Sequence, residues 1–391
     1  MKITAESMNA YLFLLCGLCT EIKRDELLKG LGTVTFARRT LRAALDGGML
    51  CEKKTPLGKT VGLSHKGYTA LSEVADLRWH YDLMSNARTM RYDSASLARR
   101  LEKSRVLFSS VMAGLPINGI TYEYERKRGR KHSGRKSRAV SGLYTSGKPL
   151  TKEAKPYETL LSENPPDVAS LYTAALIKRY EVLTGRFAPT LRINQSRARG
   201  HIIGPGTNYA CYCMNGQPEK LVTSVEEKLS GYLSGIYMRC YGAEEAGFLR
   251  RVSPSGDALL FCTRKDAVLS LVRKPGERRK KSSICDIYSR VFIIPPQKRI
   301  DRMCMQNWQK NLKDSLYLPE EIKRAEGSGF DAYVEGRYSL ELVSMDLCRI
   351  ERALEIKDQG VRLHVLCSED DKSVLEELFY GGDVLFEEVE K

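Results

Sequence analysis

The 391-residue sequence lacks several features that define common classes of protein. It contains no run of about eighteen apolar residues, the length that a membrane-spanning helix requires. Its N-terminus has no signal-peptide layout, because the apolar stretch 11–18 is short, amphipathic and followed by charged residues. These absences exclude a transmembrane or secreted class, so we expect a cytoplasmic protein with no membrane partner.

Metal-binding and disulfide patterns are also missing. The eleven cysteines are odd in number and irregularly spaced, which argues against a disulfide framework. Cys16 and Cys19 lie in an apolar helical pattern without a second pair at zinc spacing, and Cys211 and Cys213 alternate as in a strand. None of the five histidines belongs to a ligand motif, and His364 lies in an apolar strand-like run. We therefore expect buried reduced thiols, a packed core histidine, no metal and no cofactor.

Positive charge is what the chain has in excess. The 63 Lys and Arg residues outnumber the 48 Asp and Glu residues, giving a formal charge of +15 at pH 7. So many like charges repel one another, and a polyanionic partner is the simplest reason for a protein to tolerate this repulsion. Nucleic acid is favoured over a membrane surface as that partner. A chain of this length should form at least two domains.

Residues 1–78 follow the order of a winged helix-turn-helix domain. Apolar spacing over residues 8–18 predicts a first helix that buries one stripe, and residues 24–31 predict a short second helix. Thr33 or Thr35 should cap a third helix that ends near residue 45, where Gly47 and Gly48 follow. We expect its apolar face to consist of Val34, Ala37, Leu41 and Leu45.

A two-stranded wing should follow the third helix. Residues 49–53 and 60–63 read as strands around a turn at residues 55–59, and Ser64 should cap a closing helix over residues 66–75. Positive charge on the wing comes from Lys53, Lys54 and Lys59.

This arrangement predicts contact with double-stranded DNA. A recognition helix enters the major groove, where arginine pairs well with guanine, while a basic wing can grip neighbouring phosphates. The expected groove-reading residues share the polar face of the third helix: Thr35, Arg38, Arg39 and Arg42. The alternative is that the domain mediates protein contacts and that its arginines form only a solvated face.

Residues 79–150 read as a helical connector followed by a basic arm. The connector should pack as a helix against the following domain. The arm is broken by glycine and serine, and it is either the tip of a long hairpin or a segment that orders on binding; in both cases it would neutralise phosphates. Its alternative role is a solvated loop. The arm's basic residues are Arg126, Lys127, Arg128, Arg130, Lys131, Arg135, Lys136 and Arg138.

Residues 151–391 alternate strand and helix patterns, which indicates an α/β domain and makes the whole chain mixed α+β. We expect a helix over residues 167–183, a hairpin within 201–214, a helix over 222–232, and strands at 258–262 and 290–294. Nearer the C-terminus we expect strands at 332–334, 339–343, 361–367 and 384–386, with helices at 346–357 and 372–380.

Asp331, Glu341 and Lys357 form the best catalytic constellation. A strand with Asp, a turn, a strand with Glu and a following helix resemble the core of the PD-(D/E)xK nuclease fold, in which two acids hold a divalent metal and a lysine helps to activate water. That fold places lysine two residues after the second acid, where this chain has Val343. We expect a degenerate core that does not cut DNA; the alternative is a Mg²⁺- or Mn²⁺-dependent nuclease.

Both ends of the chain are similar to replication-relaxation proteins of plasmids and integrative elements. The similarity is carried by Leu63-Ser64-His65-Lys66-Gly67-Tyr68, by Phe330-Asp331-Ala332-Tyr333 and by Ser339-Leu340-Glu341-Leu342, and it covers about eighty N-terminal and forty C-terminal residues. The resemblance implies a DNA-binding accessory or regulatory protein of a mobile element, with replication or transfer proteins as partners. One short recognition helix gives little specificity, so we also expect a homodimer. A protein-binding adaptor or inhibitor is a further alternative.

Overall fold

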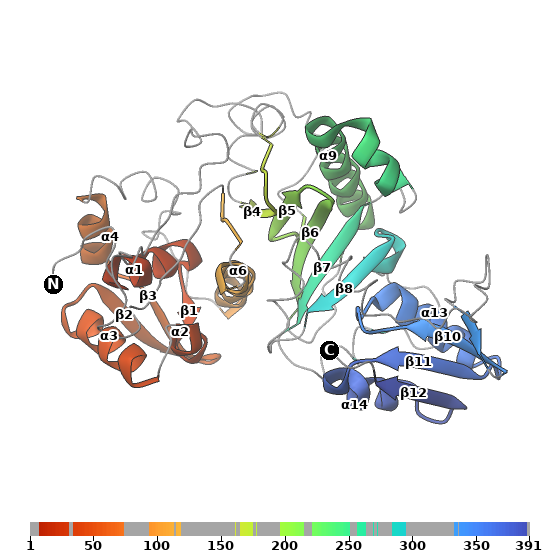
Figure 1. Cartoon of the computed structure of the whole chain (residues 1–391). Coiled ribbons are helices and arrows are strands. Elements are labelled where there is room, and N and C mark those ends of the chain that lie inside the picture. The colour runs from red at the N-terminus through yellow and green to blue at the C-terminus, as the bar shows by residue number, and fades with distance from the viewer. Residues whose placement is uncertain are drawn as a thin grey trace, which may run out of the picture. The chain divides into compact units, whose positions relative to one another are not determined.

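A computed structural model of the chain, whose helices and strands are labelled in Figure 1, divides into two units. One unit comprises residues 1–187 and 199–204, and the other comprises residues 188–198 and 205–391. Helices and sheets occur in both units, which confirms the mixed α+β class. The domain boundaries predicted at residues 78 and 150 lie outside the described residues. The structure describes residues 8–30, 34–73, 94–112, 115–118, 161, 165–174, 177, 196–214, 221–250, 256–262, 269, 272, 284–294, 332–334 and 336–388.

The first unit opens with a compact N-terminal module. Its elements are α1 (Met8–Cys19), β1 (Ile22–Lys23), α2 (Arg24–Gly30), α3 (Val34–Asp46), β2 (Leu50–Thr55), β3 (Gly58–Leu63) and α4 (His65–Ser72). The three strands form an antiparallel sheet in the order β1-β3-β2. The helices and the hairpin follow the predicted order. Strand β1 was not predicted, because two residues carry no periodic signal.

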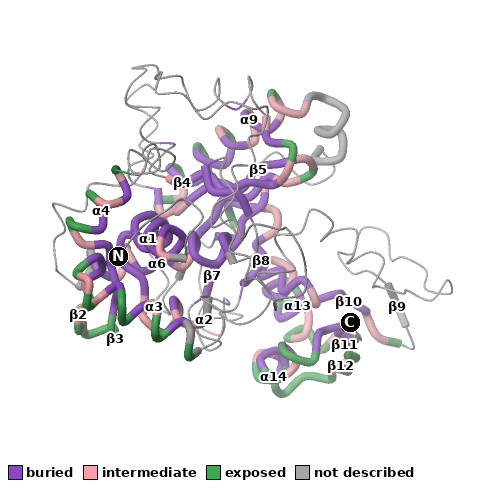
Figure 2. Tube along the Cα trace, turned by 60° about the vertical axis from the view of Figure 1, so that its left-hand side comes forward, coloured by how far each residue is buried: buried purple, intermediate pink, exposed green. Residues whose placement is uncertain are grey.

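Helix α1 is buried on all sides rather than along one stripe, so that part of the prediction is wrong. Every residue from Ala10 to Ile22 is buried (Figure 2). The reason is a second layer of packing, since α6 (Ser94–Met112) lies against α1. A helix that is apolar all round requires such cover. Helix α6 begins within the predicted connector, but it packs mainly against α1 and β1 of the preceding module and not, as the sequence predicted, against the following domain.

Two paired strands complete the described part of the first unit. Strand β4 (Ser170–Thr173) runs antiparallel to β5 (Gly200–Gly204). The helix predicted over residues 167–183 is therefore wrong at β4. All four β4 residues are buried, including the polar Ser170 and Thr173, so the strand lacks the alternation of apolar and polar residues by which periodicity identifies a strand.

The second unit contains a parallel arrangement of β6 (Thr207–Met214), β7 (Asp257–Cys262) and β8 (Arg290–Ile294). Along the chain, β6 and β7 are connected through α9 (Thr223–Arg250). This helix continues well beyond the predicted end at residue 232. A short turn of helix, η5 (Ile284–Asp286), precedes β8. None of the described helices of the chain is long and apolar enough to cross a membrane.

A buried carboxylate ties α9 to β6. Glu226 accepts hydrogen bonds from Ser196 Oγ at 2.8 Å, from the Arg197 amide at 2.7 Å and from the Tyr212 hydroxyl at 2.7 Å. The Tyr212 hydroxyl also lies 2.7 Å from that of Tyr288. Burial raises the pKa of Tyr212. These groups are deeply buried and satisfy one another, so the network holds the fold together.

A second sheet occupies the C-terminal part of this unit. It has the order β12-β11-β10-β9, with β9 antiparallel to β10 and the remaining pairs parallel. Its strands and helices lie within a few residues of their predicted positions: β9 (Ala332–Val334), β10 (Arg337–Glu341), α13 (Leu347–Lys357), β11 (Leu363–Cys367), α14 (Glu369–Leu378) and β12 (Val384–Glu388).

The turn between β10 and α13 closes the outer edge of β8. Asp346 caps α13 by accepting from the Cys348 amide at 3.1 Å, and the same oxygen accepts from the Val291 amide at 3.0 Å. The Ile293 amide donates to the Met345 carbonyl at 3.0 Å. Burial raises the pKa of Asp346 to about 6. One side chain thus serves both a helix end and a strand edge.

Candidate nucleic-acid interface

Helix α3 packs on its module through a narrow apolar stripe. Ala37, Leu41 and Ala44 are at most 1 % exposed, and they recur at helical spacing. Leu45, which was predicted on this face, is only half-buried because the stripe passes through Ala44. The helix ends as predicted, with Gly48 at a φ of 68°. This packing fixes which face of α3 is left for solvent.

The four predicted groove-reading residues all lie on the exposed side of α3. Thr35, Arg38, Arg39 and Arg42 are each exposed. Arg42 lies 3.7 Å from Asp46, with side chains 85 % and 72 % exposed, and such a helical pair contributes only about 0.3–0.5 kcal/mol. Arg38 and Arg39 have no ion-pair partner among the described residues. The cationic face can therefore meet a ligand at little cost.

The hairpin of β2 and β3 is tighter and longer than predicted. Strand β2 runs to Thr55 and β3 starts at Gly58, so only Pro56 and Leu57 form the turn. Thr55 Oγ1 donates to the Gly58 carbonyl at 2.6 Å and accepts from the Leu57 amide at 3.2 Å. Gly58 has a φ of 107°, a conformation that favours glycine. The predicted bounds are therefore wrong by two residues: β2 extends past residue 53, and β3 begins before residue 60.

The wing lysines divide between the two faces of this hairpin. Lys54 and Lys59 are directly opposite each other near the tip, and both are exposed. Lys53 is opposite Thr60 and only partly exposed, because neighbouring strand residues point to opposite faces. Two of the three predicted phosphate contacts therefore share one surface.

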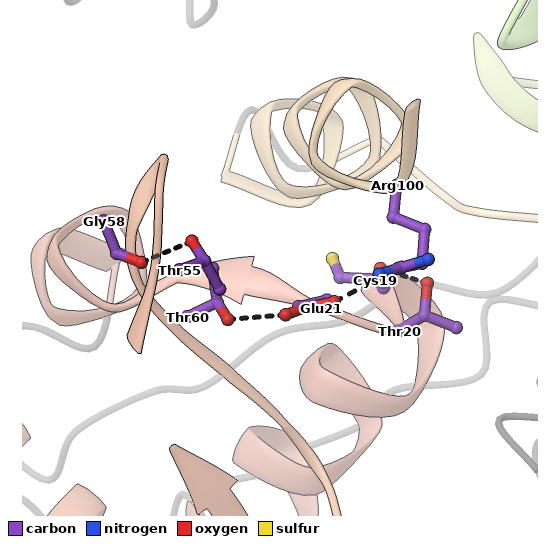
Figure 3. Close-up of polar contacts among 7 residues, drawn as sticks. All are labelled: Cys19, Thr20, Glu21, Thr55, Gly58, Thr60 and Arg100. Atoms are coloured by element: carbon purple, nitrogen blue, oxygen red, sulfur yellow. Dashed lines mark hydrogen bonds and ion pairs between the residues drawn. The ribbon is translucent and has the colours of Figure 1, made fainter. Parts of the chain in front are cut away.

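A buried carboxylate connects β3 with α6 (Figure 3). Glu21 is 3 % exposed and accepts from Thr60 Oγ1 at 2.5 Å and from Arg100 Nε at 3.1 Å. A second pair, Glu26 and Arg105 at 2.6 Å, joins α2 to the same helix. Thr20 precedes Glu21 with a φ of 59°, which turns the chain sharply after α1. Helix α6 therefore braces the strand that carries Lys59.

Sequence reasoning missed two further basic residues of this module. Arg24, the first residue of α2, lies with its Nε 3.0 Å from Glu52 Oε2. Lys66 donates to the Gly47 carbonyl at 3.0 Å, at the C-terminal end of α3. The sequence showed that Arg24 stands at the start of a helix. It did not show the ion pair with Glu52, because that partner lies 28 residues away on β2.

The residues of the nuclease alternative are not brought together where they are described. Glu341 is buried and accepts from the Ser344 amide at 2.6 Å and from Arg349 Nη1 at 3.3 Å. Lys357 donates to the Tyr380 carbonyl at 2.7 Å, at the other end of α13 from Arg349. Asp331 lies outside the described residues, as do all the basic residues of the predicted arm. Among the described residues, no group of three or more His, Cys, Asp and Glu could hold a metal.

The cysteines and histidine that were weighed as ligands are buried. Cys16, Cys19, Cys211 and Cys213 are buried free thiols. Burial raises the pKa of Cys19 to about 12, which keeps it protonated and unreactive. The Nδ1 atom of His364 lies 3.2 Å from Ser339 Oγ on the neighbouring strand, as a packed core histidine would.

No family model, curated protein or solved structure matches the chain. We therefore infer the function from the geometry of the N-terminal module.

Proposed function

We propose that the N-terminal module is a winged helix-turn-helix that binds double-stranded DNA. The observation that carries the proposal is the exposed cationic face of α3, with Arg38, Arg39 and Arg42 on one short helix. A helix of this kind fits the major groove, where arginine can donate two hydrogen bonds to guanine. Lys54 and Lys59 at the hairpin tip would contact phosphates, which position a protein without reading sequence.

We further propose that the protein is an accessory or regulatory protein of a mobile genetic element, acting in replication, transfer or transcription control. The resemblance of its two ends to replication-relaxation proteins supports this role. A homodimer on paired half-sites would supply the specificity that a single α3 helix lacks. The nuclease alternative receives less support, because the Glu341 carboxylate is already occupied by Ser344 and Arg349.

The proposal is tested by fluorescence anisotropy with duplex DNA over a graded salt series. Wild-type protein should bind, and its affinity should fall steeply as salt rises. Arg38→Ala and Arg42→Ala should each weaken binding to the preferred DNA sequence by about 1–3 kcal/mol, roughly 5- to 150-fold. Arg239→Ala, at an exposed position on α9, is the matched control and should change little.

Two results would contradict this proposal. The first is the absence of duplex affinity even in dilute buffer. The second is equal binding by the α3 variants and the α9 control. Plasmid nicking that requires Mg²⁺ or Mn²⁺ and disappears in Glu341→Ala would instead favour the nuclease.

A further inference from the structure

We propose that Glu52 competes with DNA phosphates for the basic groups of the wing, and that Arg24 is a further phosphate contact under its control. This inference rests on the proposed function and deepens it. It concerns how tightly the module holds the DNA backbone.

The Glu52 carboxylate engages two cations at once. Its Oε1 lies 3.2 Å from Lys59 Nζ, and its Oε2 lies 3.0 Å from Arg24 Nε. The side chains of Lys59, Arg24 and Glu52 are 56 %, 34 % and 26 % exposed. The Arg24 Nε atom itself is buried, but all three side chains are partly open to solvent, so a phosphate can reach the exposed parts of Lys59 and of the Arg24 guanidinium.

Strand register places these groups on one face of the sheet. Glu52 is opposite Val61, which in turn is opposite Ile22, so the three share a face. Two residues further toward the tip, that face continues with Lys54 opposite Lys59. Arg24 reaches the same face from the start of α2. Three positive groups and one negative group therefore cluster beside the turn.

Glu52 has two opposing effects in this cluster. It offsets the repulsion between Lys54 and Lys59, since like charges directly opposite in a sheet are destabilising. It also has to release Lys59 and Arg24 before either can pair with a phosphate. Because the ion pairs are partly exposed, each is weak enough for a phosphate to displace. Glu52 should therefore lower DNA affinity while keeping the free wing ordered.

The test compares Glu52→Gln with Glu73→Gln by anisotropy at fixed and graded salt. Glutamine keeps the shape of the side chain and removes the charge that holds the cations. Glu73 is exposed at the end of α4, so its change removes the same charge from the same module. We expect Glu52→Gln to bind DNA roughly two- to fivefold more tightly than Glu73→Gln, the equivalent of one exposed ion pair.

The salt dependence gives a second readout. Each additional phosphate contact steepens the slope of log affinity against log salt by about 0.9. We expect a steeper slope for Glu52→Gln, and a shallower slope with weaker binding for Arg24→Gln. In the Arg24→Gln background, the gain from Glu52→Gln should shrink. The Arg24→Gln measurement remains decisive if Glu52→Gln lowers thermal stability.

The outcomes separate this inference from the proposed function. If wild-type protein binds DNA through α3 but Glu52→Gln behaves like Glu73→Gln, the competition by Glu52 is refuted and the function stands. If Arg24→Gln leaves both affinity and slope unchanged, Arg24 is not a phosphate contact. If wild-type protein does not bind duplex DNA, both proposals are overturned.

Discussion

Asp346 shows how much a single buried side chain can do in this protein. Its carboxylate accepts from the amides of Val291 and Cys348, and it is 2 % exposed. Burial disfavours the charged form, while the two amides favour it. Desolvation is the larger effect, so the pKa lies at about 6, above the ordinary value of 3.8.

We predict that Asp346→Asn removes a pH dependence of stability. Because the folded-state pKa is raised, the folded protein binds more protons than the unfolded chain between about pH 4 and pH 6. The wild-type free energy of unfolding should therefore fall as pH rises through this window, by about 3 kcal/mol for two pKa units. Asparagine still accepts both hydrogen bonds and does not titrate.

Urea denaturation at about pH 4 and about pH 7 measures this difference. Relative to wild type, Asp346→Asn should lose less stability on going to the higher pH. Asp358→Asn, at the exposed end of the same helix, is the control and should follow wild type. An identical pH profile for the two variants would show that Asp346 does not titrate in this window.

At the scale of elements, α4 is placed by a glycine that allows very close packing. The Gly67 amide donates at 3.0 Å to the Oγ atom of Ser64, which is the N-cap residue of α4. A Cβ atom built on Gly67 would lie 2.3 Å from the Met49 carbonyl oxygen and 2.6 Å from Leu63 Cδ1. Only a residue without a side chain allows α4 to approach the hairpin strands in this way.

We predict opposite effects for two glycine substitutions in helices. Gly67→Ala should destabilise the protein by about 2 kcal/mol or more, because backbone atoms have to move apart. Gly231→Ala should stabilise it by up to about 1 kcal/mol, since a Cβ there meets no atom within 4 Å and alanine favours a helix. Urea denaturation compares the two, and destabilisation by both would contradict the packing argument.

Elements with a periodic pattern could be predicted from the sequence, and elements shaped by distant packing could not. Helices α2, α3 and α13 and strand β8 lie at or near their predicted positions, because spacing and capping residues mark them. Strand β4 could not be assigned, because its sequence, Ser-Leu-Tyr-Thr, has no apolar–polar alternation and also fits a helix. The end of α9 was placed too early, because its later residues interrupt the apolar stripe without ending the helix.

The candidate site divides in the same way. The exposure of Arg38, Arg39 and Arg42 followed from helical periodicity alone. The grouping of Arg24, Glu52 and Lys59 depends on strand register and on the position of α2, so it could not be read from residues far apart in the chain.

At the scale of the whole molecule, the N-terminal module is not a separate body. Helix α6 covers α1 and contributes Arg100 and Arg105 to ion pairs with Glu21 and Glu26. The first unit accordingly extends far beyond residue 78. Its apolar first helix would face water if the chain ended before α6 began.

We predict that a fragment of residues 1–78 does not fold cooperatively, whereas the whole chain does. The fragment loses the cover of α1 and leaves Glu21 without Arg100, and an uncompensated buried charge costs about 3–5 kcal/mol. Circular dichroism during thermal unfolding distinguishes the two. A sharp transition in the 1–78 fragment, at the temperature of the whole chain, would show that α6 is dispensable.

The turn that carries Asp346 has a further consequence for the protein at high concentration. An open strand edge offers unpaired amides and carbonyls to other chains, and such edges nucleate aggregation. The outer edge of β8 is instead occupied by its own chain, through the Met345 carbonyl and the Asp346 carboxylate. Intermolecular strand addition is thereby hindered at the β8 edge of a layer whose strands β7 and β8 are strongly apolar.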